Sequence, residues 1–200
     1  MKHTRKSPSL HGNAPDKSPV ALLLIDVIND LDFPGNEELV RNAVPMARQI
    51  ADLKRAARKA SAPVIYVNDN FGRWRSDLNA QVEHCLEADV PGKPVAELLR
   101  PGEEDYFVLK PKHSGFFSTT LDILLEYLQV ETLVLSGIAG NICVLFTAYD
   151  AYLRDYRILV PSDCIVSNTA AENQYALDQM QKILKAQICE SKEIDFDSLK

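Results

Sequence analysis

The sequence has little of what marks several well-known classes of protein. Its four cysteines are widely spaced over 200 residues and form no Cys-x-x-Cys pair, so neither a disulfide scaffold nor a zinc ribbon is indicated. The first apolar run starts only at Val20 and is short, so we expect neither a signal peptide nor a membrane span. Lys and Arg number 22 against 28 Asp and Glu, a net charge of -6, which argues against nucleic acid as a partner. We therefore expect a cytoplasmic protein that binds neither nucleic acid nor membrane.

Motifs that bind phosphates or cofactors are also missing. The chain has no P-loop, no Gly-x-Gly-x-x-Gly after its first apolar run and no Gly-x-Ser-x-Gly elbow. Asp69 and His84 are the nearest pair of possible metal ligands, and neither has a third partner at a ligand spacing. The sequence thus predicts no cofactor and no metal site.

Apolar runs alternate with helical patterns along the chain. The runs are rich in Val, Ile and Leu and apolar on both faces, which is typical of buried parallel strands. They predict strands over residues 20–25, 63–67, 106–109, 132–135, 157–160 and, at an edge, 186–189. Helices are predicted from Asn36 with a kink or a restart at Pro45, in short pieces over 79–99, after a capping box at Thr119, over 141–153 and over 169–185.

This alternation predicts an α/β fold with three layers, α/β/α, around a six-stranded, mainly parallel sheet. Residues 1–18 are polar throughout and are expected to form a flexible tail. Residues 19–200 contain no linker and are expected to form a single domain.

Residues with chemical potential follow the predicted strands. In parallel sheets ligands bind outside the carboxyl ends of the strands, so Asp26, Lys110 and the segment from Gly137 to Cys143 should face one edge. Cys143 lies near the start of a predicted helix, where backbone N–H groups and the helix dipole favour a thiolate and can hold an oxyanion. A cation lowers the pKa of a thiol and a carboxylate can carry its proton. Taken singly, these residues also fit a turn aspartate, a solvated lysine and a core cysteine.

Three blocks of the sequence resemble the isochorismatase-like cysteine hydrolases, which include nicotinamidases, N-carbamoylsarcosine amidases and ureidoacrylate amidases. The resemblance extends over residues 19–190, and its blocks are Ala21–Asp30, Lys110–Leu121 and Leu135–Val144 with Thr147-Ala148 and Asp150-Ala151. It implies the isochorismatase-like hydrolase fold and a catalytic triad of Asp26, Lys110 and Cys143. Lys110 is preferred to Lys112 because it keeps the family's spacing to the Ser-Gly-Phe-Phe segment.

The resemblance also implies a chemistry. A cis peptide between Ile138 and Ala139 would turn the Ala139 N–H toward the substrate beside the Cys143 N–H, and the two would form an oxyanion hole. The reaction would be hydrolysis of a carbon–nitrogen bond in a small amide or carbamoyl compound through a thioester. At least a homodimer is expected, because oligomers are common in the family.

The chain departs from the family's pattern in places that affect the substrate. The Asp-x-His metal loop of nicotinamidases is replaced by Asn68–Trp74, which argues against nicotinamidase activity. Gly115 and Gly140 are smaller than the family's usual residues and predict a wider pocket. Candidate substrate-binding residues are Asn68, Trp74, His113, Phe117 and Asn141.

Two other functions stay open at this point. One is hydrolysis of a vinyl ether of the isochorismate type, which needs no cysteine nucleophile. The other is a catalytically idle binding module on the same fold.

Overall fold

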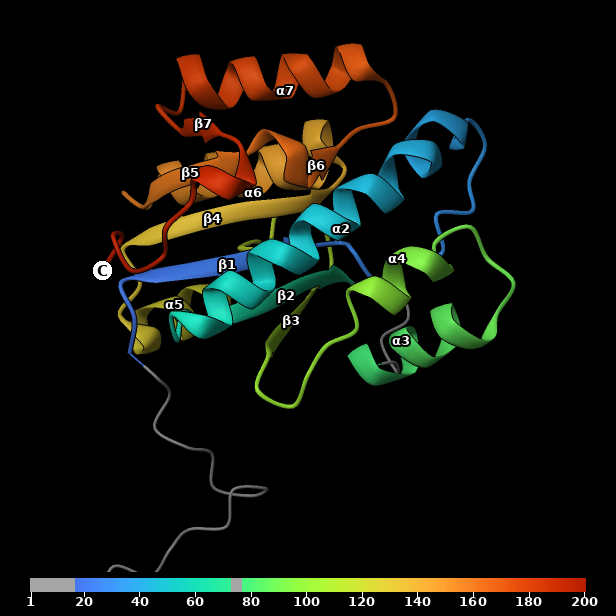
Figure 1. Ribbon diagram of the computed structural model, residues 1–200, viewed down its shortest axis with the longest axis horizontal. Helices are drawn as coiled ribbons and strands as arrows, with labels where there is room; N and C mark the ends of the chain where they lie inside the picture. The colour runs from blue at the N-terminus through green and yellow to red at the C-terminus, as the bar shows by residue number, and fades with distance from the viewer. Residues whose placement is uncertain (1–16, 73–76) are drawn as a thin grey trace, which may run out of the picture.

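A parallel β-sheet forms the centre of the computed structural model, which describes residues 17–72 and 77–200 (Figure 1). The sheet order is β3-β2-β1-β4-β5-β7, with β6 paired to β4, and every pairing is parallel. The strands are β1 (Val20–Ile25), β2 (Val64–Asp69), β3 (Tyr106–Lys110), β4 (Thr132–Ile138), β5 (Arg157–Pro161), β6 (Ile165–Val166) and β7 (Gln187–Cys189).

The sheet thus has seven strands where the sequence predicts six. The additional strand, β6, has only two residues and lies beside the end of β4, with Gly137 opposite Ile165. A two-residue strand carries no repeating pattern, which is why periodicity misses it.

Helices cover the sheet on both faces (Figure 1). The helices are α2 (Glu37–Lys59), α3 (Leu78–Glu87), α4 (Lys93–Leu98), α5 (Leu121–Leu128), α6 (Leu145–Tyr152) and α7 (Ala170–Lys182). A π-helical turn, η1 (Gly140–Val144), precedes α6, and two 3₁₀ turns are η2 (Ser162–Cys164) and η3 (Ser191–Glu193).

Two of the helical expectations are wrong in detail. Pro45 neither ends nor restarts α2, which runs through it for 23 residues. The ring of Pro45 lies on the exposed face, while Ala43, Met46 and Ala47 beside it are buried against the sheet, so packing outweighs the cost of about 3 kcal/mol for an interior proline. Thr119 does not form the capping box, because the N-cap of α5 is Thr120 without a side-chain cap.

Each face of the sheet carries its own hydrophobic cluster. Side chains alternate between the faces of a strand. In β1, Leu22 and Leu24 pack with α2, α3 and α4, whereas Leu23 and Ile25 pack with α5, α6 and α7. These two cores fix the strands, and the carboxyl ends of β1, β3 and β4 therefore bring the predicted site residues to one edge. Among the helices that the structure describes, none is long and apolar enough to cross a membrane.

Candidate active site

Asp26, Lys110 and Cys143 meet at the carboxyl edge of the sheet. Asp26 follows β1, Lys110 ends β3, and Cys143 lies in the η1 turn after β4. The Lys110 Nζ atom lies 2.8 Å from Asp26 Oδ2 and 3.5 Å from Cys143 Sγ. The thiol of Cys143 is also a hydrogen-bonding neighbour of the Asp26 carboxylate. The structure thus brings the three predicted residues into mutual contact.

A second carboxylate, Asp69, shares Lys110. Asp69 lies opposite Lys110 in the β2–β3 register, and its Oδ2 atom is 3.3 Å from Lys110 Nζ. The Asp69 backbone N–H donates to Asp26 Oδ1 at 2.6 Å. An ammonium has three N–H donors, and here they face Asp26, Asp69 and Cys143. The sequence places Asp69 at a strand end, but only the pairing of β2 with β3 reveals its contact with Lys110.

Burial dominates the protonation of these groups. It raises the pKa of Asp26, an effect that Lys110 opposes. Burial lowers the pKa of Lys110, but the charges of Asp26, Cys143 and Asp69 outweigh this and raise it overall. Burial raises the pKa of Cys143 to about 12, Asp26 adds to the rise, and Lys110 acts against it. The expectation of a favoured thiolate is therefore wrong for this site, because burial and the charge of Asp26 together outweigh the single ammonium of Lys110. The resting cysteine is a thiol.

The turn that carries Cys143 is held from both ends. The Ile138–Ala139 peptide bond is cis, and the Ala139 carbonyl accepts hydrogen bonds from the N–H groups of Ile142 at 3.0 Å and Val144 at 3.2 Å. Further along, Thr147 donates to the Cys143 carbonyl at 2.7 Å and accepts from the Gly115 N–H at 3.0 Å. The predicted helix start near Asn141 is thus a π-helical turn, a feature that is frequent at functional sites.

Gly115 and Gly140 do not widen the pocket as the sequence predicts, because other side chains fill the space. A Cβ atom at Gly140 would lie 2.6 Å from Asn173 Oδ1 and 2.9 Å from Ser167 Oγ. A Cβ atom at Gly115 would lie 2.7 Å from a methyl group of Val67. Ser167 accepts a hydrogen bond from the Asn141 N–H at 3.0 Å and donates to Asn173 Oδ1 at 2.9 Å. Because Gly140 has no side chain, η1 can pack closely against α7. No local sequence pattern predicts this contact.

Two of the predicted substrate-binding residues are exposed, and one of them, His113, lies beside the thiol of Cys143. His113 is exposed, its Nδ1 atom is 3.9 Å from Cys143 Sγ, and its ring lies 5.4 Å from that of Phe146. Phe117 is 55 % exposed. Both side chains are therefore accessible to a ligand.

The other predicted substrate-binding residues have different places. Asn141 is partly buried, and its Oδ1 atom is buried without a hydrogen-bond partner among the described residues. Asn68 is fully buried. Its side-chain amide accepts a hydrogen bond from the N–H of Ile28 and donates one to the carbonyl of Ile28. It connects β2 to the loop after β1 instead of facing a ligand, which differs from the expectation. Trp74 lies outside the described residues, as do residues 1–16 of the tail expected over residues 1–18.

Asp69 and His84, the nearest pair of possible metal ligands in the sequence, have different side-chain partners. His84 Nε2 lies 3.0 Å from Asp30 Oδ2, whereas Asp69 faces Lys110. Within residues 17–72 and 77–200, no three His, Cys, Asp or Glu side chains are grouped as metal ligands.

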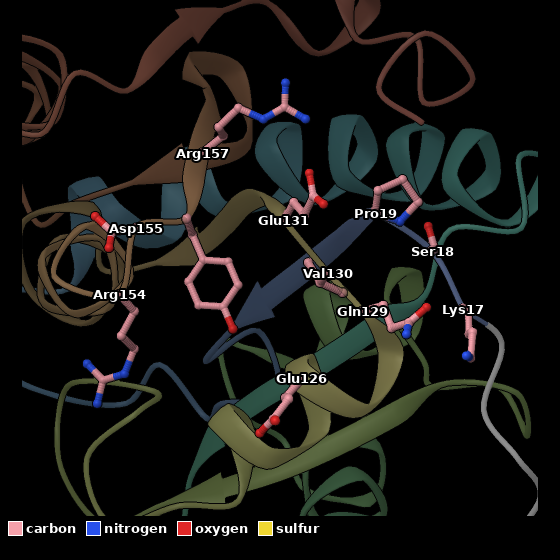
Figure 2. Close-up of a pocket in the computed structure, with 11 residues that line it drawn as sticks. Lys17, Ser18, Pro19, Glu126, Gln129, Val130, Glu131, Arg154, Asp155 and Arg157 are labelled. Atoms are coloured by element: carbon pink, nitrogen blue, oxygen red, sulfur yellow. The ribbon is translucent and has the colours of Figure 1, made fainter.

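A hollow of about 940 Å³ lies at the opposite end of the sheet (Figure 2). It is lined there by Ser18 and Pro19 before β1, Glu131 before β4, and Arg157 at the start of β5. None of the predicted site residues lines it, so size alone does not locate the chemistry.

The chain is similar to known proteins over nearly all of its described length. The model of the isochorismatase domain matches residues 20–193. The isochorismatase family protein YaaI of Bacillus subtilis is 42% identical over 178 residues, which cover 89% of this chain and 97% of YaaI. The ureidoacrylate amidohydrolase RutB of Methylorubrum extorquens is 28% identical, covering 74% of this chain and 70% of RutB.

The crystal structure of N-carbamoylsarcosine amidase from Thermoplasma acidophilum has a TM-score of 0.67 and 27% identity, covering 88% of this chain and 98% of that one. The parallel sheet with its two helical layers is shared with this structure. Together with the match of the domain model, the similarity shows that the chain belongs to the isochorismatase family of hydrolases.

Proposed function

We propose that the protein is a cysteine hydrolase that cleaves a carbon–nitrogen bond of a small amide or carbamoyl compound through a thioester. The contact of Lys110 with both Asp26 and Cys143 carries this proposal. A thiol with an ionised carboxylate and a cation at hydrogen-bonding distance is the arrangement that nucleophilic acyl transfer requires. Relatives that are named as amidases support the choice of bond.

Asp26 is the proton carrier in the first half of the reaction. Its raised pKa makes the ionised carboxylate a stronger base toward the thiol of Cys143. The Cys143 Sγ–H proton passes to Asp26 as sulfur bonds to the carbonyl carbon, and the electron pair of the C=O π bond moves to oxygen. Lys110 donates to both partners and stabilises the negative charge that moves between them.

Backbone N–H groups of Ala139 and Cys143 receive the oxyanion. The three N–H donors of Lys110 face Asp26, Asp69 and Cys143, so the lysine has none left for the substrate oxygen. The C=O bond then re-forms, the C–N bond breaks, and the nitrogen leaves with the proton from Asp26.

Water completes the cycle. It gives a proton to Asp26 and adds to the thioester carbon, and the new tetrahedral intermediate collapses with breakage of the C–S bond. The proton returns from Asp26 to sulfur, and the acid leaves. Each step uses only the substrate, water and these residues.

A screen of small primary amides and ureides for ammonia release tests the proposal. Wild-type protein should release ammonia, and Cys143→Ala should lose at least about 10³-fold in kcat/KM. Cys189→Ala is the matched control, since Cys189 is partly buried in β7 and should be silent. Mass spectrometry of quenched reactions should detect the acyl group on Cys143 only. Full activity of Cys143→Ala would exclude the thioester and leave vinyl ether hydrolysis or another route.

A further inference from the structure

A second, smaller hollow of about 380 Å³ lies between α3 and the loop after β1, and Phe71 in its wall is two residues from Asp69, which contacts Lys110. Its walls come from the loop after β1, from Phe71 after β2 and from α3. A volume of this order suits part of a small ligand. Six of its lining residues define it here as the α3 pocket: Ile28, Asp30, Asp32, Phe33, Phe71 and His84.

Hydrogen bonds fix the α3 pocket relative to the base Asp26. Gln81, which also lines the hollow, donates to the Asp69 carbonyl at 3.2 Å. The N–H of the same residue, Asp69, is bonded to Asp26 Oδ1. On the other wall, Asn68 holds both backbone groups of Ile28. The pocket and the base are therefore parts of one rigid framework.

Two phenylalanines present an apolar surface to the hollow. Phe33 is 37 % exposed and Phe71 is 47 % exposed. Phe71 has φ 50°, which is rare for a bulky residue. Its N–H donates to Asp69 Oδ1 at 2.7 Å, so the carboxylate that contacts Lys110 also holds this backbone. Rings placed in this way gain by covering an apolar ligand group.

The polar rim of the α3 pocket is acidic. Asp30 and Asp32 supply two carboxylates, and no Lys or Arg is found among the described residues that line the hollow. Asp30 is oriented from two sides, by His84 Nε2 at 3.0 Å and by the Cys85 thiol at 3.4 Å. Two negative charges over a hollow repel a carboxylate and attract a cation or a hydrogen-bond donor.

We infer that the α3 pocket receives the part of the substrate remote from the scissile carbonyl, and that this part is an apolar or aromatic group ending in a neutral or cationic function, not a carboxylate. That the substrate carries a scissile amide rests on the proposed function. The chemical nature of its remote group is inferred from the α3 pocket alone.

Three amides of one shape test the charge preference. Benzamide, 4-(aminomethyl)benzamide and 4-carbamoylbenzoate differ only at the far end of the ring. We expect kcat/KM for 4-(aminomethyl)benzamide to exceed that for 4-carbamoylbenzoate by about tenfold or more. In the double variant Asp30→Asn, Asp32→Asn, this ratio of the two kcat/KM values should be smaller. Equal rates, or a preference for 4-carbamoylbenzoate, would overturn the inference.

Phe71→Ala tests the apolar surface. It should raise KM for benzamide by about tenfold, since it removes a ring that covers the ligand. Tyr127→Ala is the matched control, because Tyr127 is an exposed aromatic residue on α5, away from the pocket. An unchanged KM in Phe71→Ala, with the circular dichroism spectrum intact, would contradict the inference.

A binding experiment separates the pocket from the chemistry. Benzylamine has no amide, so its binding to Cys143→Ala protein does not depend on turnover. Titration should shift the imidazole NMR signals of His84, and Phe71→Ala should weaken that binding by about tenfold. If benzylamine binds in this way while no amide is hydrolysed, the inference stands and the proposed reaction fails. If amides are hydrolysed and benzylamine leaves His84 unchanged, the inference fails and the reaction stands.

Discussion

Replacing Gly140 by alanine tests how tightly the turn of Cys143 is held against α7. The backbone of Gly140 is not in the left-handed region, so alanine is allowed conformationally. At an open site Gly→Ala would stabilise the protein by about 0.4–1 kcal/mol through the unfolded chain. Here the new Cβ would stand 2.6 Å from Asn173 Oδ1 and 2.9 Å from Ser167 Oγ, so the side chains must move.

The cost follows from the hydrogen bonds that such a movement breaks. Asn173 accepts from Ser167, and Ser167 accepts from the Asn141 N–H. One or two such bonds contribute about 0.5–1.5 kcal/mol each, so steric crowding wins over the entropic gain. We expect Gly140→Ala to lower the free energy of unfolding by about 1–2 kcal/mol and the Tm by about 2–8 °C.

A double-mutant cycle identifies the cause. Asn173→Ala alone should cost about 1 kcal/mol, because it removes one hydrogen bond to Ser167. In the double variant the crowding is relieved, so we expect a favourable coupling of at least about 1 kcal/mol between positions 140 and 173. Urea unfolding of the four proteins measures it. A stabilising Gly140→Ala, or costs that add within about 0.5 kcal/mol, would refute the reasoning.

Three further predictions concern the charged groups. Because the pKa of Cys143 is raised to about 12, its labelling by iodoacetamide, followed by mass spectrometry, should increase about tenfold per pH unit between pH 7 and 10, and a plateau there would contradict the buried thiol. Because the pKa of Asp26 is raised from its usual 3.8 and the ionised form is the base, kcat/KM should fall on acidification already above that value. Asp26→Asn should lower kcat/KM by at least about 10²-fold, and a fully active variant would remove Asp26 from the mechanism. Asp105→Ala should lower the free energy of unfolding, measured by urea denaturation, by about 3–5 kcal/mol, because buried Lys54 loses the carboxylate that lies 2.8 Å from its Nζ atom. Glu104→Ala, at an exposed position, is the control and should change it by less than about 0.5 kcal/mol.

The sequence predicts the main elements of the fold because its buried strands are continuous runs of apolar residues. Every residue of β1 is fully buried, and such a strand is visible as Val20–Ile25 in the sequence. The prediction fails where tertiary packing decides. Pro45 stays inside α2 because helix residues before and after it in the sequence are buried against the sheet. The strand β6 forms because β4 lies beside it.

The site is predictable to a similar degree. Asp26 and Lys110 are found because they follow or end a strand, and Cys143 is found because it lies in the turn that follows β4. The contacts of Asp69 and Asn173 depend on which strands and helices become neighbours, and no local pattern encodes this. The same holds for protonation, since the pKa of Cys143 reflects burial and the charge of Asp26 more than the position of Cys143 near the start of a predicted helix.

The position of β3 in the sheet determines which part of the site unfolds first in a local opening. In the described chain β3 is the edge strand, paired with β2 alone, whereas β1 and β4 lie in the interior. Edge strands open at lower free energy than central ones, so their amide protons exchange sooner. Lys110 is thus carried by the least protected strand of the site, while Asp26 and Cys143 follow the most protected ones. A brief local opening would therefore withdraw the cation first and leave the acid and the thiol in place.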